Sequence, residues 1–152
     1  MSHVCERVTI RFPYSKARTL LREFVESAIA TGTPQVVEFV LGAARSPLRK
    51  TVLLQYERGH DPLQFDERWN VSWTPQGGGP YPDFHGELGI GMSPTRETIL
   101  ELTGDYVPPL GLLGETFDFV AGSRLAAATA CALLVRIVRE LEERHQREID
   151  AH

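Results

Sequence analysis

One carboxylate and three aromatic rings on one face of a predicted strand are the side chains best suited to chemistry. Glu67 alternates with Phe65, Trp69 and Trp73 in a run where every second residue points the same way. A carboxylate held against apolar surface has a raised pKa and can act as a general acid or base. Glu67 is therefore the candidate catalytic residue, and the alternative is that it lies at the solvated end of the strand.

Aromatic and phenolic side chains could instead line a site for an apolar molecule. Small-molecule pockets are built from aromatic walls with a few polar groups, and a phenol can orient a carbonyl or hydroxyl of a ligand. The candidate ligand-binding residues are Tyr56, Phe65, Trp69, Trp73, Phe84, Tyr106 and Leu134. The alternatives are a plain hydrophobic core for the tryptophans and half-buried rings with hydroxyls in water for the tyrosines.

Metal and cofactor chemistry has no support in the sequence. The five histidines are scattered, and no HxH, HExxH or His/Cys cluster exists to hold zinc. Neither Cys5 nor Cys131 has a CxxC partner or a metal-ligand spacing, so we expect reduced, structural thiols. The glycines between Gly86 and Gly91 do not lead from a strand into a helix, and we expect them to permit sheet curvature or close approach of a helix.

Composition indicates a single domain over residues 1–152. The chain has 42% hydrophobic and 24% charged residues, which is typical of a soluble globular protein. Its net charge of −4 and the lack of a basic stripe argue against nucleic acid or an anionic membrane as a partner. No signal-peptide pattern is present, and the alanine-rich run is too short to span a bilayer. We therefore expect a cytoplasmic protein without integral membrane association.

The elements that would position these residues are mainly strands. Alternation from Val4 to Phe12 predicts a first strand, which Pro13 ends, and Ser15 is expected to cap a helix from Lys16 to about Ala30. Gly32 and Pro34 stop that helix, and Gly42 to Lys50 is a loop or ragged strand end. Five further strands are expected over Val36–Leu41, Thr51–Arg58, Phe65–Thr74, Phe84–Met92 and Arg96–Tyr106. Consecutive strands should pair antiparallel, while the first must pair across the sheet.

A long helix closes the chain. Pro108 and Pro109 turn the backbone, and apolar residues at spacings of three and four then predict a helix from about Phe117 to about Gln146. Its centre, from Ala126 to Val135, carries no charge, so protein or a cavity should cover most of its circumference. We expect the charged remainder of the helix to be a solvated face.

Residues 71–134 carry motifs that resemble a known family. The motifs are Trp73 at a strand end, Pro82-x-Phe84-x-Gly86, Gly104-x-Tyr106-x-Pro108-Pro109-Leu110-Gly111, Leu113-Gly114, Asp118 and Arg124-x-Ala126-x-x-Thr129. They resemble the SRPBCC or START-related helix-grip superfamily, which includes lipid-transfer domains, pollen-allergen-like binders and polyketide cyclases, and above all an uncharacterised bacterial branch. The resemblance implies an α+β fold of order β-α-β-β-β-β-β-α. In that fold a curved antiparallel sheet wraps around the final helix and an apolar cavity lies between them.

Three functions follow from these observations. The preferred one is binding or carriage of a small hydrophobic molecule such as a lipid, a polyketide or an isoprenoid, because apolar burial yields roughly 25 cal/mol per Å². The second is a cyclase or dehydratase acting on a polyketide-like substrate with Glu67 or a tyrosine as acid or base; Glu67→Gln should then abolish turnover and leave the fold intact. The third is a self-associating protein, a possible homodimer, that pairs through a sheet edge or an apolar helix face.

Overall fold

The computed structural model describes residues 2–41, 48–59, 68–77, 81–107 and 119–151. Six strands and two helices lie within these ranges. They are β1 (Ser2–Ile10), α1 (Tyr14–Ala30), β2 (Gln35–Leu41), β3 (Leu48–Arg58), β4 (Arg68–Pro75), β5 (Asp83–Met92), β6 (Thr98–Val107) and α2 (Phe119–Asp150). This order confirms the predicted α+β fold class.

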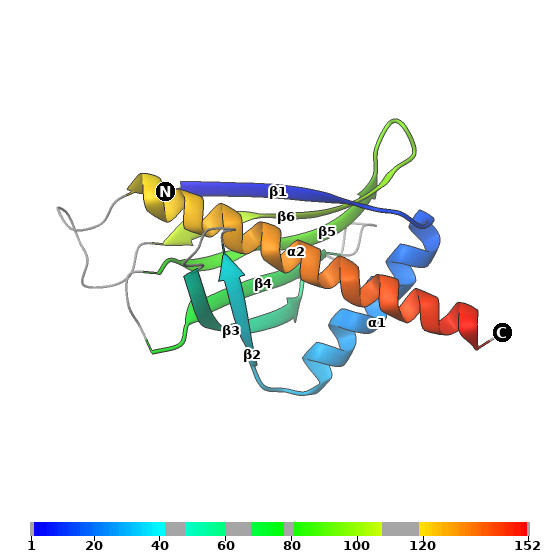
Figure 1. Cartoon of the computed structure of the whole chain (residues 1–152), viewed down its shortest axis with the longest axis horizontal. Helices are drawn as coiled ribbons and strands as arrows, with labels where there is room; N and C mark the ends of the chain where they lie inside the picture. The colour runs from blue at the N-terminus through cyan, green and yellow to red at the C-terminus, as the bar shows by residue number, and fades with distance from the viewer. Residues whose placement is uncertain (1, 42–47, 60–67, 78–80, 108–118, 152) are drawn as a thin grey trace.

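The strands form one antiparallel sheet in the order β1-β6-β5-β4-β3-β2. β1 pairs with β6 from Ser2↔Tyr106 to Ile10↔Thr98, so the first strand joins the last one after the excursion through α1. In Figure 1 the sheet curls beneath α2, with β1 beside the helix and β2 near it at the opposite edge. The predicted wrapping of a curved antiparallel sheet around the final helix is therefore confirmed.

Alternate residues of the strands point towards α2 and form the core. On β4, Trp69, Val71 and Trp73 are buried, while Arg68 and Thr74 are exposed. This pattern matches the predicted face of the strand. Because each fully buried large apolar side chain contributes about 1.5–3 kcal/mol, the inner face of the sheet supplies much of the stabilisation of the fold.

Helix α2 buries one side and exposes a narrow strip on the other. It packs most closely along β1 and more sparsely on β6, β2 and α1. Its fully buried positions include Ala126, Thr129, Ala130, Leu133, Leu134, Ile137 and Leu141. The prediction of a covered centre holds for that side, but Ala128, Cys131 and Val135 face solvent. Within the described part of the chain, neither helix has the length and apolar character needed to cross a bilayer.

The start of α1 differs from the predicted one. Pro13, with φ −60° and ψ 149°, takes the N-cap position, and the Ala17 N–H donates to its carbonyl at 2.9 Å. The helix therefore begins at Tyr14, and the predicted cap at Ser15 is wrong because the proline carbonyl already opens the helical hydrogen-bond ladder. The predicted stop at Gly32 is confirmed, since this residue has φ +71° and donates to the Ile29 carbonyl at 3.0 Å.

Two strand boundaries also need correction. β3 begins at Leu48 rather than Thr51, because residues 48–50 continue the ladder with the end of β2. β6 begins at Thr98 rather than Arg96, because Arg96 lies in a turn with φ 65° and its N–H donates to the Ser93 carbonyl at 2.9 Å. The predicted start of β4 at Phe65 lies outside the described residues.

Candidate functional site

Six of the predicted ligand-binding residues are buried between the sheet and α2. They are Tyr56 on β3, Trp69 and Trp73 on β4, Phe84 on β5, Tyr106 on β6 and Leu134 on α2. The other two predicted site residues, Phe65 and Glu67, lie outside the described residues, so the catalytic role of Glu67 stays a prediction. The candidate site within the described residues therefore lies in the apolar interior.

Three of these aromatic residues form a row across β4, β5 and β6, near one end of these strands. Trp73 pairs with Phe84 in the β4–β5 register, and Phe84 pairs with Tyr106 in the β5–β6 register. The Trp73 and Phe84 rings stack with their centroids 4.2 Å apart and their planes 13° apart. We call Trp73, Phe84 and Tyr106 the aromatic row. It gives the inner face of the sheet a wide, flat and apolar surface.

A pair of facing glycines supports the aromatic row. Gly86 on β5 pairs with Gly104 on β6. A Cβ atom on Gly86 would lie 2.5 Å from Phe84 Cζ, and one on Gly104 would lie 2.8 Å from the same atom. The Phe84 ring therefore lies over both glycines, in space that any other residue type would fill. The close neighbours at these two glycines are the main chain of the paired strand and this ring; the long helix, one of the two reasons expected from the sequence, is not among them.

The Trp73 indole places a polar hydrogen in this apolar interior. Trp73 is fully buried, and its Nε1–H has no hydrogen-bond partner among the described residues. A buried donor without an acceptor costs about 1–3 kcal/mol. Native proteins satisfy most such groups, so an oxygen atom supplied by a bound molecule is a natural partner for this one.

A second polar contact ties the sheet to α2. The hydroxyl of Tyr81, just before β5, hydrogen-bonds with the hydroxyl of Thr129 on α2. Thr129 in turn donates to the Leu125 carbonyl at 2.7 Å, so Tyr81 is the donor of the pair. Burial raises the pKa of Tyr81, and its hydrogen bond with Thr129 acts in the opposite direction. Lys50 Nζ lies 5.9 Å from the centroid of the Tyr81 ring, which adds a cation beside this contact.

Sequence reasoning missed Tyr81 as a site residue because it lies in the run of prolines and glycines before β5. Thr129 was noticed only as part of a motif. One signal could have drawn attention to it: Thr129 is the single hydroxyl residue in the uncharged centre of the helix, from Ala126 to Val135. A polar residue on a buried helix face requires a partner.

The Tyr56 phenol lies at the α1 side of the same interior. Its ring packs edge-on against Phe24 of α1, with centroids 6.0 Å apart and an interplanar angle of 82°. Burial raises the pKa of Tyr56 well above its usual value, and the nearby charge of Arg136 opposes this effect only in part. The phenol is thus neutral at pH 7 and suited to hydrogen bonding rather than to proton abstraction.

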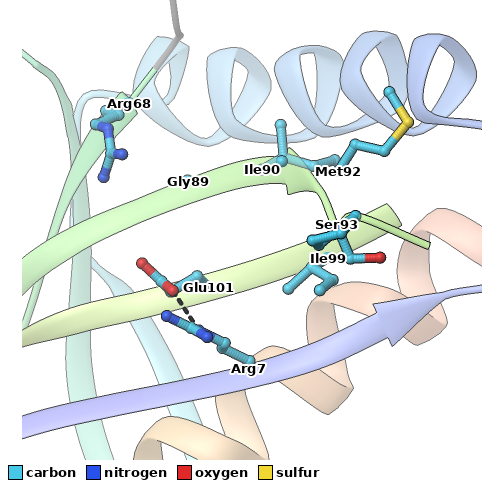
Figure 2. Close-up of a pocket in the computed structure, with 10 residues that line it drawn as sticks. Arg7, Arg68, Gly89, Ile90, Met92, Ser93, Ile99 and Glu101 are labelled. Carbon is cyan, nitrogen blue, oxygen red and sulfur yellow. Dashed lines mark hydrogen bonds and ion pairs between the residues drawn. The ribbon is translucent and has the colours of Figure 1, made fainter. Parts of the chain in front are cut away.

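A separate hollow of about 330 Å³ lies over the outer side of the sheet (Figure 2). Arg68, Gly89, Glu101 and Arg7 follow one another across β4, β5, β6 and β1 in register. Arg7 Nε lies 2.5 Å from Glu101 Oε2, and Arg68 Nη1 lies 3.6 Å from Glu87 Oε2. The hollow arises because Gly89 has no side chain. Both guanidinium groups already have carboxylate partners, so we do not assign a ligand to it.

The described residues offer no metal site and no disulfide. They contain no cluster of three or more histidine, cysteine, aspartate or glutamate side chains that could hold a metal ion. Cys5 and Cys131 are both free and exposed. The candidate site is the inner face of the sheet around Trp73.

Comparison with protein-family models and with curated proteins gives no match. Among solved structures, the chain is similar to the ZhuI aromatase/cyclase from Streptomyces sp. R1128, with 18% identity, a TM-score of 0.51 and coverage of 95% of this chain and 94% of that one. It is also similar to the protein TTHA0849 from Thermus thermophilus, with 13% identity, a TM-score of 0.50 and coverage of 93% and 97%. At these identities the likeness shows the fold alone, and that fold agrees with the helix-grip arrangement.

Proposed function

We propose that this protein binds and carries a small hydrophobic molecule, of the lipid, polyketide or isoprenoid type, between the sheet and α2. The observation that carries this proposal is the buried Trp73 Nε1–H, which lies in an aromatic interior without an acceptor among the described residues. A ligand with an apolar body and one carbonyl, hydroxyl or ether oxygen would match both properties.

The energetics favour an apolar ligand with few polar groups. Burying about 200 Å² of apolar ligand surface yields ~5 kcal/mol at 25 cal/mol per Å². A hydrogen bond to the Trp73 indole would add about 0.5–1.5 kcal/mol. The aromatic row supplies flat surface, which suits a ring system or an unsaturated chain. The aromatase/cyclase with the same fold makes polyketide-like compounds a sensible first set for screening.

The two interior tyrosines are neutral phenols at neutral pH. Burial raises the pKa of both Tyr56 and Tyr81, so neither phenol is ionised at neutral pH. Such groups donate hydrogen bonds and do not act as bases. The Tyr56 phenol could thus orient a ligand oxygen, whereas the Tyr81 hydroxyl already donates to Thr129.

Native mass spectrometry of freshly purified protein, followed by identification of any released molecule, tests the proposal directly. We expect a copurifying apolar ligand, or a thermal shift with compounds of this class. Titration of the best ligand should then show binding to Trp73→Phe weakened by about twofold to tenfold, because the indole hydrogen bond is lost. Trp69→Phe is the matched control, since it removes a buried indole from the same strand.

Two results would count against the proposal. One is the absence of both a copurifying molecule and a thermal shift across the whole panel. The other is equal weakening by Trp73→Phe and Trp69→Phe, because this would point to general loss of packing rather than to a specific hydrogen bond.

A further inference from the structure

A groove of about 880 Å³ runs between the edge strand β2 and the middle of α2. β2 is the sheet edge opposite β1, and α2 packs more closely on β1 than on β2. Apolar side chains line the groove from three elements: Phe24 of α1, Val37 and Phe39 of β2, and Ala132 and Val135 of α2. Charged side chains line it as well: Glu38, Glu140, Glu143, Arg136 and Arg139. The groove is therefore a surface channel beside the buried core with both apolar and charged walls.

Two arginines border this channel without a carboxylate partner in the described part of the chain. Arg136 and Arg139 are exposed and lie three residues apart, so they point from one face of α2. Neither forms an ion pair with any described residue. The neighbouring carboxylates have other partners: Glu38 pairs with Arg49 at 3.4 Å, and Glu140 pairs with Arg144 at 3.1 Å.

The positive charge at this place is local. The chain as a whole has a net charge of −4, so the overall field of the molecule would repel an anion. Glu143 also lines the groove, one turn beyond Arg139, and makes no ion pair with it among the described residues. An anion at Arg136 and Arg139 would therefore be bound by these two guanidinium groups and not by the field of the molecule.

The groove adjoins the buried aromatic site through Phe24 and Tyr56. Phe24 lines the groove and packs edge-on against the Tyr56 ring. A molecule with its polar end at Arg136 and Arg139 could therefore lay its apolar part against Phe24, where the groove meets the interior.

We propose that the groove between β2 and α2 binds an amphipathic acid, with its anionic head on Arg136 and Arg139 and its apolar tail along Phe24 towards Tyr56. The inference rests on the proposed function in one respect, since the tail enters the same apolar interior. Guanidinium groups bind carboxylate or phosphate oxygens in bidentate, charge-assisted hydrogen bonds, and the apolar lining of the groove suits an alkyl or polyketide chain.

Calorimetric titration with three matched probes tests this proposal: dodecanoic acid, dodecyl phosphate and 1-dodecanol, each below its critical micelle concentration. Wild-type protein should bind at least one acid more tightly than the alcohol. The double variant Arg136→Gln/Arg139→Gln should lose about tenfold or more in affinity for that acid and bind the alcohol as before. The preferred head, carboxylate or phosphate, then identifies the anion.

The control variant is Arg7→Gln/Arg68→Gln, on the outer side of the sheet (Figure 2). Both double variants remove two positive charges and take the net charge from −4 to −6. Because the control leaves the groove unchanged, it should bind the acid as the wild type does. Equal losses in the two double variants would overturn the proposal, since they would reveal an effect of net charge alone.

Other outcomes separate the groove from the interior site. Equal affinity for acid and alcohol, unchanged by Arg136→Gln/Arg139→Gln, would refute the groove and leave interior binding intact. Acid binding that needs both arginines but is insensitive to Trp73→Phe would support the groove and contradict the interior hydrogen bond. Acetate binding as tight as that of dodecanoic acid would overturn the role of the tail. Dimerisation through Val36–Val40 that blocks acid binding would assign the groove to a second copy instead.

Discussion

The hydrogen bond between Tyr81 and Thr129 should couple α2 to the sheet measurably. Both side chains are buried, with 3% and 0% of their surface exposed. Thr129→Val keeps the shape of the side chain and leaves the Tyr81 hydroxyl without its acceptor, so we expect a loss of about 1–3 kcal/mol in the free energy of unfolding. Tyr81→Phe should cost less, about 0.5–1.5 kcal/mol, because the Thr129 hydroxyl still donates to the Leu125 carbonyl.

The double variant Thr129→Val/Tyr81→Phe gives the decisive comparison. It removes both hydroxyls, so neither is left as an unpaired buried group, and its loss of stability should fall short of the sum of the two single losses by about 1 kcal/mol. Urea denaturation at constant pH measures all four free energies, and an unchanged slope with denaturant would indicate that only stability has altered. The Tm should fall by ~2–4 °C for each kcal/mol of stability lost, as expected for a domain of about this size.

Additivity would refute this reasoning. If the single losses add to within about 0.3 kcal/mol, the two hydroxyls do not interact and α2 is held by apolar packing alone. A destabilisation by Tyr81→Phe larger than that by Thr129→Val would also contradict the assignment of Tyr81 as the donor.

Two further predictions follow from the interior. Gly86→Ala should destabilise the fold by about 2 kcal/mol or more, because its methyl group would lie 2.4 Å from the Thr103 carbonyl oxygen and 2.5 Å from Phe84. Gly91→Ala on the same strand has open space around the new methyl group and should stay within about 0.5 kcal/mol of wild type in chemical denaturation; equal effects would disprove the close packing. Because burial raises the folded-state pKa of Tyr56 above its ordinary value of 10.0, the unfolded chain releases this proton first, and stability should fall as the pH rises above about 10. Tyr56→Phe should make that fall shallower than in the wild type between about pH 10 and 11.5, and identical slopes for the variant and the wild type would contradict the burial effect.

Hydrophobic alternation was sufficient to predict the element order and the inner face of the sheet. Trp69, Val71 and Trp73 share parity on β4, and tertiary packing had no reason to override that pattern, because a half-buried strand must turn its apolar side inward. Antiparallel pairing followed from the short turns between consecutive strands.

Contacts between residues distant in sequence were beyond the reach of pattern reasoning. Tyr81 and Thr129 are 48 residues apart, and only the placement of α2 on the sheet brings their hydroxyls together. The pairing of Gly86 with Gly104 depends on the β5–β6 register, which no local signal specifies. The predicted start of α1 was wrong for a local reason, because the Pro13 carbonyl, and not the Ser15 side chain, is the first acceptor of the helix.

The glycine pair has a consequence for any attempt to redesign the specificity of the protein. At Gly86 and Gly104 the depth of the interior is already limited by main-chain atoms, so no substitution there can enlarge it. If a ligand binds against this face, as proposed, room for a bulkier one must come from smaller side chains in place of the rings above, Phe84 or Trp73. A library that varies those two positions and keeps both glycines would change the space above the sheet while preserving the strand pairing beneath it.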